Sequence, residues 1–425
     1  MSKIEKLRGF KDYYPEDMEK REWIFQNMRK IAKNFGFQPI DYPSLEFLEM
    51  YRLKSGDELV NQTYSFTDKG NREITLIPEA TPSTMRMLVA RKDLLKPIKW
   101  YNIPKLWRYE EPQSGRNREH YQFNADYFGE SGVFVNSEII SLACEVLNSM
   151  GLKNLYVVRV NHRKLMEAIL ERIGSIDVAS DLSIIDHFRK ESVEEISGKL
   201  EEHGIKGQKL KNLVSLLSKS YRAEEMEESL SLIDRDLLNE SGYKELRETL
   251  NQLKDNGYEN IVYDPATVRG LSYYTGIVFE GFDREGKFRS IFGGGRYDGL
   301  SELFQGPPIP AIGFGMGDAV LENILRENNC WESVNKDKTY FIIGIGMEGK
   351  KVANHILYDL RRKGRKVSMD YSDRNLTNSI KHASSMGFQY IILVGEKEMR
   401  NKSITLRDLA SGEQKIIGMD NLGEI

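Results

Sequence analysis

The stretch RGLSYYTGIVFEGFDREGKFRSIFGGGRYDGL, residues 269–300, decides how this chain should fold. Its runs Tyr274–Phe282 and Phe288–Phe292 are rich in aromatic and β-branched residues, and a polar segment that contains glycine separates them. This pattern predicts two strands joined by a turn. The glycines Gly293–Gly295 follow the second strand, and residues without side chains allow a ligand to lie directly on the backbone. We therefore expect a sheet with a ligand site at this strand end.

Three polar residues stand at the beginning of the first of these strands. Arg269, Tyr273 and Tyr274 combine a guanidinium group with two phenols, a set that can bind a small zwitterion. Because neighbouring residues of a strand point to opposite faces, we expect one tyrosine to line the site and the other to belong to the core. The alternative for Arg269 is a surface position or an ion pair with a nearby acid such as Asp264.

A second glycine pattern lies downstream, in PAIGFGMGDAVLENIL, residues 310–325. Gly313, Gly315 and Gly317 alternate along a predicted strand, Pro310–Met316, so their three bare positions share one face of the sheet. A helix is expected to follow over Ala319–Glu327. A flat base or a ribose would fit on such a face.

A charged hairpin lies upstream, in WRYEEPQSGRNREHYQFNADYFGE, residues 107–130. Its polar side chains are Arg108 and Glu110 at the first strand, Arg116 and Arg118 in the loop, and Gln122 and Asp126 on the returning strand. Arginines on one face make a cradle for anions, because guanidinium groups match phosphate oxygens. A hairpin that simply faces water is the alternative. Glu79 and Thr81, in the run Pro78–Thr81, add a carboxylate and a hydroxyl just past another strand.

The remaining pattern fills in the expected fold. Strands predicted at Glu73–Ile77, Trp100–Ile103, Leu106–Tyr109 and His120–Phe128 would form one antiparallel sheet. Helical spacing over Met18–Phe35 predicts a helix, and a leucine-spaced, charged segment from Asp177 to Asp255 predicts a helical insertion. A polar linker, Asn328–Asp337, precedes alternating strands and helices with apolar strands at Tyr340–Ile345, Lys366–Asp370 and Tyr390–Val394. That order predicts a small parallel α/β domain.

Composition excludes several classes of protein. The 425 residues are 40% hydrophobic and 29% charged, and no run approaches the roughly 18 apolar residues of a membrane helix. The N-terminus has no apolar signal core, so we expect a cytoplasmic protein without a membrane partner. Neither Cys144 nor Cys330 belongs to a CxxC pair, and no metal-ligating cluster is expected among the protein's side chains. Residues 336–425 hold 16 Lys and Arg against 11 Asp and Glu, which favours contact with a polyanion there.

Together these motifs resemble the class II aminoacyl-tRNA synthetases, and the run from Arg269 to Leu300 is similar to the signature of the histidyl-tRNA synthetase family. The resemblance covers nearly the whole chain. It implies an α+β catalytic domain, with an antiparallel sheet and flanking helices, in residues 1–172 and 257–328. It also implies a helical insertion domain, residues 173–256, and a C-terminal α/β anticodon-binding domain, residues 338–425.

The resemblance implies that the protein activates L-histidine with ATP and Mg²⁺ and transfers it to the 3′ end of its tRNA. The residues that would bind histidine are Glu79, Thr81, Gln122, Asp126, Arg269, Tyr273 and Tyr274. Those that would bind ATP are Arg108, Glu110, Arg116, Arg118, Gly293, Gly294, Gly295, Gly315 and Gly317. Arg108 and Arg269 would be catalytic. The helix before Pro43 resembles the motif that builds a homodimer interface, and the insertion would contact the tRNA acceptor stem.

The chain departs from the family's pattern at three positions. Val320 stands where an arginine usually stacks on adenine, Asp126 stands where a glutamate commonly faces the imidazole, and Ser272 replaces an aspartate. Two other functions remain open at this point. One is a catalytically silent, histidine-binding paralogue that regulates a histidine-biosynthesis transferase, against which the C-terminal module and the intact Arg108 and Arg269 argue. The other is a synthetase for a different amino acid.

Overall fold

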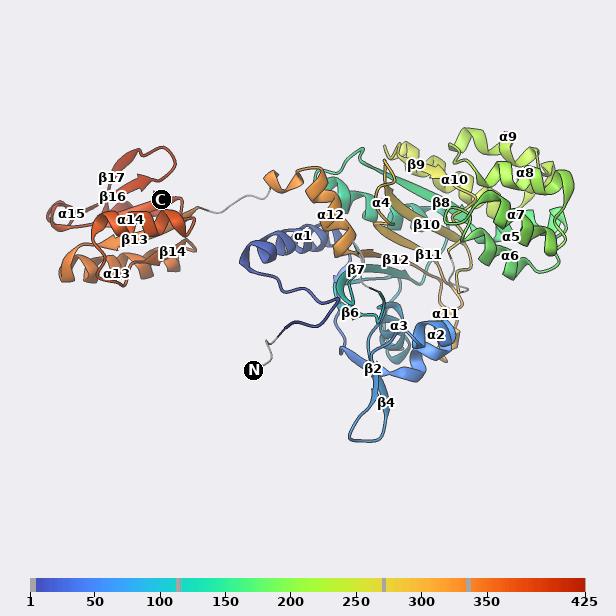
Figure 1. Cartoon of the computed structure of the whole chain (residues 1–425), viewed down its shortest axis with the longest axis horizontal. Helices are drawn as coiled ribbons and strands as arrows, with labels where there is room; N and C mark the ends of the chain where they lie inside the picture. Colours follow the sequence, from blue (N-terminus) through green and yellow to red (C-terminus); the bar gives the residue numbers. More distant parts are fainter. Residues whose placement is uncertain (1–4, 112–114, 116, 270–272, 334–337, 425) are drawn as a thin grey trace. The chain divides into compact units, whose positions relative to one another are not determined.

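The computed structural model describes the chain except residues 1–4, 112–114, 116, 270–272, 334–337 and 425 (Figure 1). The chain divides into two compact units, Met1–Val334 and Asn335–Ile425. Among the described residues, no helix combines the length and the apolar character needed to cross a membrane.

The first unit is built around one large sheet. In spatial order its strands are β1 (Gln38–Pro39), β5 (Ile98–Asn102), β7 (Glu119–Phe128), β12 (Ala311–Gly317), β11 (Phe292–Arg296), β10 (Ile277–Asp283), β8 (Tyr156–His162) and β9 (Ile261–Tyr263), and β6 (Lys105–Trp107) pairs with β7. All neighbours are antiparallel except β1 with β5 and β8 with β9. The expected antiparallel sheet is therefore confirmed in its interior, whereas its two edge pairs are parallel.

Two predicted strands differ from the structure, one in its position along the chain and the other in the sheet to which it belongs. Phe288–Phe292 is a loop up to Ile291, and β11 begins at Phe292, so that the three glycines lie within the strand. Glycine has a low strand propensity, but β10 and β12 pair with this segment from both sides and hold it extended. Strand β4 (Glu73–Leu76) exists, yet it pairs with β2 (Leu45–Phe47) and β3 (Ser65–Thr67) in a separate three-stranded sheet.

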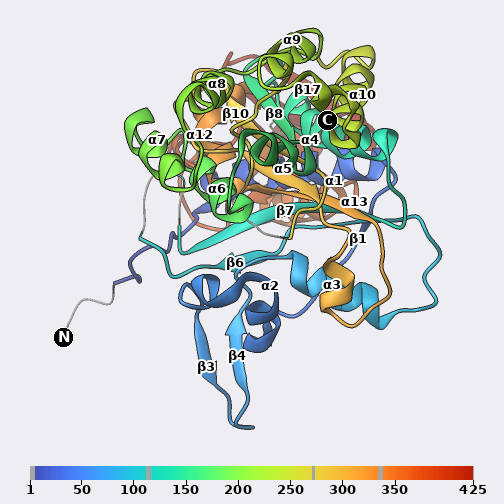
Figure 2. The ribbon, with the colours of Figure 1, turned by 90° about the vertical axis from the view of Figure 1, so that its right-hand side faces the viewer.

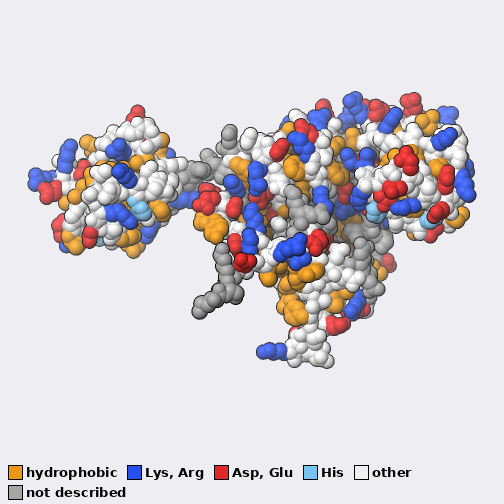
Figure 3. Space-filling view, in the orientation of Figure 1, with side chains coloured by type: hydrophobic (Ala, Val, Ile, Leu, Met, Phe, Trp, Pro, Cys, Tyr) orange, Lys and Arg blue, Asp and Glu red, His pale blue; other side chains and the backbone are white. Residues whose placement is uncertain are grey.

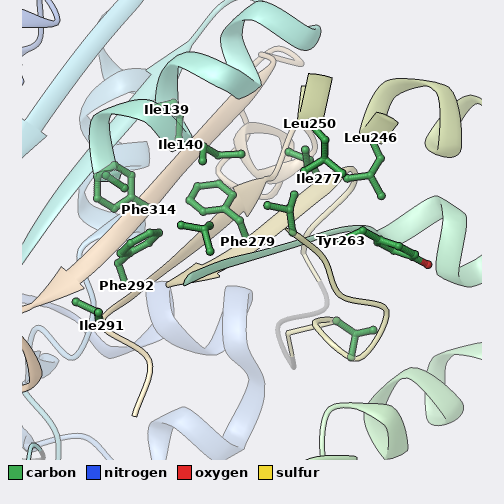
Figure 4. Close-up of a cluster of buried hydrophobic side chains, with 14 of the residues drawn as sticks. Ile139, Ile140, Leu246, Leu250, Tyr263, Ile277, Phe279, Ile291, Phe292 and Phe314 are labelled. Carbon is green, nitrogen blue, oxygen red and sulfur yellow. The ribbon is translucent and has the colours of Figure 1, made fainter. Parts of the chain in front are cut away.

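Helices cover one face of the large sheet. Helices α1 (Pro15–Asn34), α4 (Val133–Ser149) and α12 (Asp318–Glu327) contribute to one core cluster that also contains Phe123, Phe279 and Phe314 from the sheet. Figure 4 shows Ile139 and Ile140 of α4 gathered with Phe279 and Phe314. Ile24, Met28 and Ala32 of α1 are buried in this core. The apolar stripe of α1, on which the expectation of a dimer interface rested, therefore packs within its own chain.

A group of helices follows β8 in the sequence and precedes β9, and Figure 2 shows these helices gathered together. They are α5 (Arg163–Ile173), α6 (Val178–Ile185), α7 (Val193–Glu202), α8 (Gly207–Leu217), α9 (Met226–Ser231) and α10 (Ser241–Asp255). From α6 onward they form the helical insertion that the sequence predicts. The leucines that predicted this segment, Leu210, Leu213 and Leu217, are buried. Ser192 caps α7 through a reciprocal hydrogen-bond pair with Glu195, which fixes where that helix begins. The shorter helices α2 (Leu48–Val60), α3 (Thr81–Ala90) and α11 (Leu300–Leu303) lie elsewhere in the first unit.

The second unit has its own sheet and its own core. Its strands, in spatial order, are β14 (Lys366–Met369), β13 (Thr339–Gly344), β15 (Tyr390–Val394), β16 (Ser403–Asp408) and β17 (Gln414–Gly418), with helices α13 (Gly346–Arg362), α14 (Leu376–Ser385) and α15 (Glu396–Arg400). The first three strands are parallel, as expected, but β16 and β17 are antiparallel. The sheet of this domain is therefore mixed, and the prediction of a purely parallel sheet is wrong. The sequence analysis predicted no strands after Val394, where β16 and β17 lie.

Candidate active site

The site lies on the sheet face opposite the aromatic core. Gln122, Asn124 and Asp126 alternate along β7, and they pair in register with Gly317, Gly315 and Gly313 of β12. Directly paired residues of antiparallel strands project to the same side, so each polar side chain stands beside a bare glycine. Gly293 and Gly295 of β11 continue this row next to Gly315 and Gly313. The result is a stretch of sheet without side chains, bordered by polar residues.

A cavity of about 390 Å³ lies above this glycine row. Of the predicted site residues, those that line it are Glu79, Thr81, Arg108, Gln122, Asp126, Arg269, Tyr273, Tyr274, Gly293, Gly315 and Gly317. They come from β7, β11, β12, the first residue of α3 and the loops that precede α3, follow β6 and precede β10. Residues from segments up to 238 positions apart, Glu79 and Gly317, thus meet in one place, as the sequence predicts.

The glycines are needed because polar side chains lie flat on them. An added Cβ at Gly315 would overlap the Gln122 amide, one at Gly293 would overlap the Arg269 guanidinium, and one at Gly313 would overlap the Asp126 carboxylate. An added Cβ at Gly295 would lie 2.8 Å from Cδ1 of the Tyr274 ring, which is also an overlap. Side chains on the row would therefore displace the groups that border the cavity.

Arg269 is held by Glu280 of β10. Its Nη1 donates to Glu280 Oε1 at 2.8 Å, and its backbone has the left-handed φ of 52°, which costs free energy for a residue with a side chain. Burial raises the pKa of the Glu280 carboxyl, and the charge of Arg269 opposes this shift. Asp264, the alternative partner, instead accepts from Arg189 at 2.7 Å. Arg269 therefore does form an ion pair with a nearby acid, which is Glu280 and not Asp264, and it also lies on the cavity wall.

Asp126 is bonded to a tyrosine that the sequence analysis did not single out. The hydroxyl of Tyr297 donates to Asp126 Oδ1, and both side chains are buried. Burial, together with the nearby charge of Asp126, raises the pKa of Tyr297 well above its ordinary value, so the phenol keeps its proton. Tyr297 follows Gly293 and Gly295 at a spacing of two, and this alternation is the signal that could have identified it.

Both Tyr273 and Tyr274 line the cavity, and their ring centroids lie 4.6 Å apart. The prediction that only one of them does so is wrong. Strand β10 begins at Ile277, so the tyrosines belong to the loop before it and do not alternate. The two rings together form one wall.

Arg108 lies beside the turn that carries Glu79. Its Nε donates to the Pro78 carbonyl oxygen at 2.9 Å, which joins the end of β6 to the start of α3. Thr81 is the first residue of α3. This bond fixes the arginine and the carboxylate in neighbouring positions on the same cavity wall.

Some other predicted site residues in the described part of the chain are not among those that line the cavity. Arg118 Nε donates to the carbonyl oxygen of Glu110 at 3.0 Å, and its guanidinium lies 4.1 Å from the Tyr109 ring centroid, so the hairpin folds on itself. Gly294 faces the core, where an added Cβ would lie 2.8 Å from Phe279 Cζ. Arg116 lies outside the described residues. The roles of these four residues, and that of Gly295, stay predictions.

The cavity also contains residues that the sequence analysis missed. Asn124, Glu280, Arg289 and Tyr297 line it, together with Val320, the residue at the place of the usual arginine. Asn124 stands midway between Gln122 and Asp126, so strand alternation could have identified it. No pattern in the sequence marks Arg289, which lies in a loop.

Comparisons with known proteins show the family of this chain. The family model described as "Histidyl-tRNA synthetase" matches residues 9–319, and that described as "Anticodon binding domain" matches residues 339–425. The histidine–tRNA ligase of Thermoplasma volcanium is 46% identical over 99% of this chain and 97% of its own length. The chloroplastic and mitochondrial one of Arabidopsis thaliana is 34% identical over 98% and 85%. The crystal structure of histidyl-tRNA synthetase from Nostoc, 22% identical, covers 100% of this chain and 99% of its own with a TM-score of 0.85.

The mainly antiparallel sheet, the catalytic model matched over residues 9–319 and the match of the C-terminal domain define the class as that of the aminoacyl-tRNA synthetases. Within that class, the matched catalytic model and the 46% identical relative decide the family. The chain belongs to the histidyl-tRNA synthetase family, as its motifs predicted.

The placement of Gly294 can be tested through stability. Gly294→Ala should lower the free energy of unfolding by about 1–3 kcal/mol, because its Cβ would overlap the Gly313 carbonyl oxygen and the ring of Phe279 in the core. Gly317→Ala is the matched control, since its Cβ would meet nothing within 4 Å. Urea denaturation of both variants measures the difference. An unchanged stability of Gly294→Ala would show that Gly294 does not face the core.

Proposed function

We propose that this protein is a histidine–tRNA ligase that activates L-histidine with ATP and then transfers it to the 3′ end of its tRNA. The observation that carries the proposal is a single cavity that has Arg108 and Arg269 on its walls and the Asp126–Tyr297 pair beside the glycine row. Two arginines suit a carboxylate and a phosphate, and a buried carboxylate suits the N–H group of an imidazole.

The first step needs no general base. The histidine carboxylate is ionised at neutral pH, and its oxygen attacks the α-phosphorus of ATP. A bond forms between that oxygen and phosphorus while the bond to the bridging oxygen of the β-phosphate breaks, and pyrophosphate leaves with the electron pair. Arg108 and Arg269 would hold the two reactants in line and neutralise the charge that develops on the phosphoryl oxygens.

Histidine would be recognised at both of its ends. Glu79, with Thr81 and Gln122, would bind the α-ammonium group and the backbone of the amino acid, since a carboxylate suits a cation. Asp126 would accept from the imidazole N–H, while the Tyr297 hydroxyl fixes the position of that carboxylate. The paired rings of Tyr273 and Tyr274 would pack against the imidazole. A larger or an acidic side chain would fit poorly in this place.

ATP would lie on the glycine row, with its base or ribose on Gly315 and Gly317 and its α-phosphate at Arg108. Glu110, Arg116 and Arg118 would close over it from the hairpin. Mg²⁺ takes one or two carboxylates when phosphates supply its other ligands, and Glu280 on the cavity wall is a carboxylate that could contribute. When bound, the ion would neutralise phosphate charge. Among the described residues, no group of three or more His, Cys, Asp or Glu is arranged to hold a metal without substrate.

The remaining regions would serve tRNA. We assign residues 1–172 and 257–328 to the catalytic core, 173–256 to a helical insertion near the acceptor stem, and 338–425 to anticodon binding. The match of residues 339–425 to the anticodon binding domain supports the last assignment and argues against a purely regulatory histidine-binding paralogue. In the face seen in Figure 3, Lys and Arg are interspersed with Asp and Glu and do not gather in one patch. A cytoplasmic location belongs to the same proposal.

The proposed activity is tested by ATP–pyrophosphate exchange measured with each amino acid in turn. Exchange that depends on histidine alone supports it. Exchange with a different amino acid, or none with any, would contradict it.

The role of Arg269 can be separated from a purely structural one. Arg269→Ala should lower kcat of exchange by about 10²-fold with a smaller effect on the KM for histidine, because its contact strengthens as charge develops in the transition state. Arg269→Lys should restore only part, since a point charge cannot bridge two anions. Arg284→Ala, whose guanidinium donates to the Asn154 carbonyl oxygen outside this cavity, is the control. A folded alanine variant with unchanged kcat would remove Arg269 from the mechanism.

Removal of the second unit should separate the two steps. A chain that ends at Val334 retains all the described residues of the cavity, so histidine-dependent exchange should stay within about threefold of the full chain, while tRNA charging falls steeply. Both activities are measured on the same preparation. Equal losses in the two assays would contradict this division.

We also propose a homodimer, now on a different surface. Leu45, Phe47 and Phe66 of the small β2–β4–β3 sheet are 42%, 55% and 50% exposed, and clustered exposed apolar side chains mark interaction sites. Sedimentation at micromolar concentration should give twice the mass of the chain, and Phe47→Glu should shift the protein towards the monomer. A monomeric wild-type protein would refute the proposal.

A further inference from the structure

A second cavity, of about 790 Å³, adjoins the first in the same unit. The two share Arg269, Glu280, Arg289 and Ser290 as lining residues. The second cavity lies over the outer strands β10 and β8, which provide Glu280 and Arg159, and reaches Arg189 and Lys190 just after α6. A ligand that fills the first cavity can therefore extend past Arg269 and Arg289.

Arg289 stands at the junction of the two cavities. It lies in the loop between β10 and β11 and is exposed. The first residue of β11, Phe292, pairs with Met316 of β12, so the loop ends at the edge of the sheet from which Gly317 leads into α12. Val320, near the start of that helix, lines the first cavity with Arg289. Arg289 thus approaches the end of the glycine row that the nucleotide would occupy, from outside all the motifs quoted above.

The charges around the cavities favour a polyanion at this junction. The described lining of the first cavity has three cations, Arg108, Arg269 and Arg289, and three carboxylates. The described lining of the second has five cations and two carboxylates. Asp264 behind it is bonded to Arg159 and Arg189, and Lys190 to Asp186, but Lys and Arg still outnumber the acids. The potential therefore becomes more positive from the first cavity towards the second.

ATP carries about four negative charges, most of them on its outer phosphates. With the α-phosphate between Arg108 and Arg269, the only described lining cation of the first cavity not yet assigned is Arg289. We propose that Arg289 binds the β- and γ-phosphates of ATP, and the pyrophosphate that they become, at the mouth of the second cavity. This inference rests on the proposed function. It also places a cation near the nucleotide on the side of β11. On the side of α12, this chain has Val320 at the place where the family usually has an arginine.

Arg289→Ala is compared with a matched control, Arg284→Ala. Arg284 lies in the same loop, but it donates to the Asn154 carbonyl oxygen and lines neither of the two cavities in the described structure. Removing a charge-assisted bond to the outer phosphates should weaken binding of a non-hydrolysable ATP analogue about tenfold, whereas AMP binding should stay within about twofold. The KM values for ATP and for pyrophosphate in exchange should rise in parallel, and that for histidine should not. Arg289→Lys should retain part of the affinity.

Calorimetric titration with the ATP analogue and with AMP decides the matter. Equal weakening of both ligands, no weakening of either, or the same effect in Arg284→Ala would overturn the role of Arg289. These outcomes are distinct from failure of the proposed function, which is seen in the wild-type protein as a lack of histidine-dependent exchange.

Discussion

The site depends on one packing constraint, which is that strands β11 and β12 present a row of glycines on one face of the sheet. Gly293, Gly295, Gly313 and Gly315 leave space in which the Arg269, Tyr274, Asp126 and Gln122 side chains lie against the backbone. The opposite face of the sheet carries Phe279 of β10 and Phe314 of β12, which pack in one core cluster with the helices. The glycine face also packs against α3 and α11, in a second core cluster that contains Val278 and Ala311, so the part of this face that is available to a ligand is the glycine row itself.

This arrangement has a cost in stability that the rest of the domain offsets. Arg269 has a left-handed backbone, and its charge is balanced by Glu280 inside a cavity. Its Nε is buried and has no hydrogen-bond partner among the described residues. Such features persist only where the surrounding structure fixes them, and they gather at functional sites. A buried, oriented guanidinium group needs little reorganisation when charge develops near it, so the same features that cost stability would favour catalysis.

The sequence predicted where strands and helices lie along the chain better than it predicted which strands pair with each other. Apolar runs placed β9, β12 and β15 within a residue or two, because burial of alternate or consecutive apolar residues depends on local pattern alone. The pattern could not show that β4 belongs to a separate sheet, or that β11 is a strand in spite of its glycines, since pairing with neighbours decides both. The motifs identified most of the cavity. The positions of Tyr297 and Asn124 at the cavity could be predicted from strand alternation. That of Arg289 could not, because it depends on where its loop meets β11 in the sheet, and no sequence pattern marks this.

The most direct measurement is a crystal structure of the protein with a non-hydrolysable analogue of histidyl-adenylate. The imidazole should lie within hydrogen-bond distance of Asp126, the phosphate equivalent should lie between Arg108 and Arg269, and the nucleoside should rest on the glycine row at Gly315 and Gly317. An analogue bound elsewhere, or bound with its phosphate equivalent away from both arginines, would contradict the assignment of this sheet face as the active site.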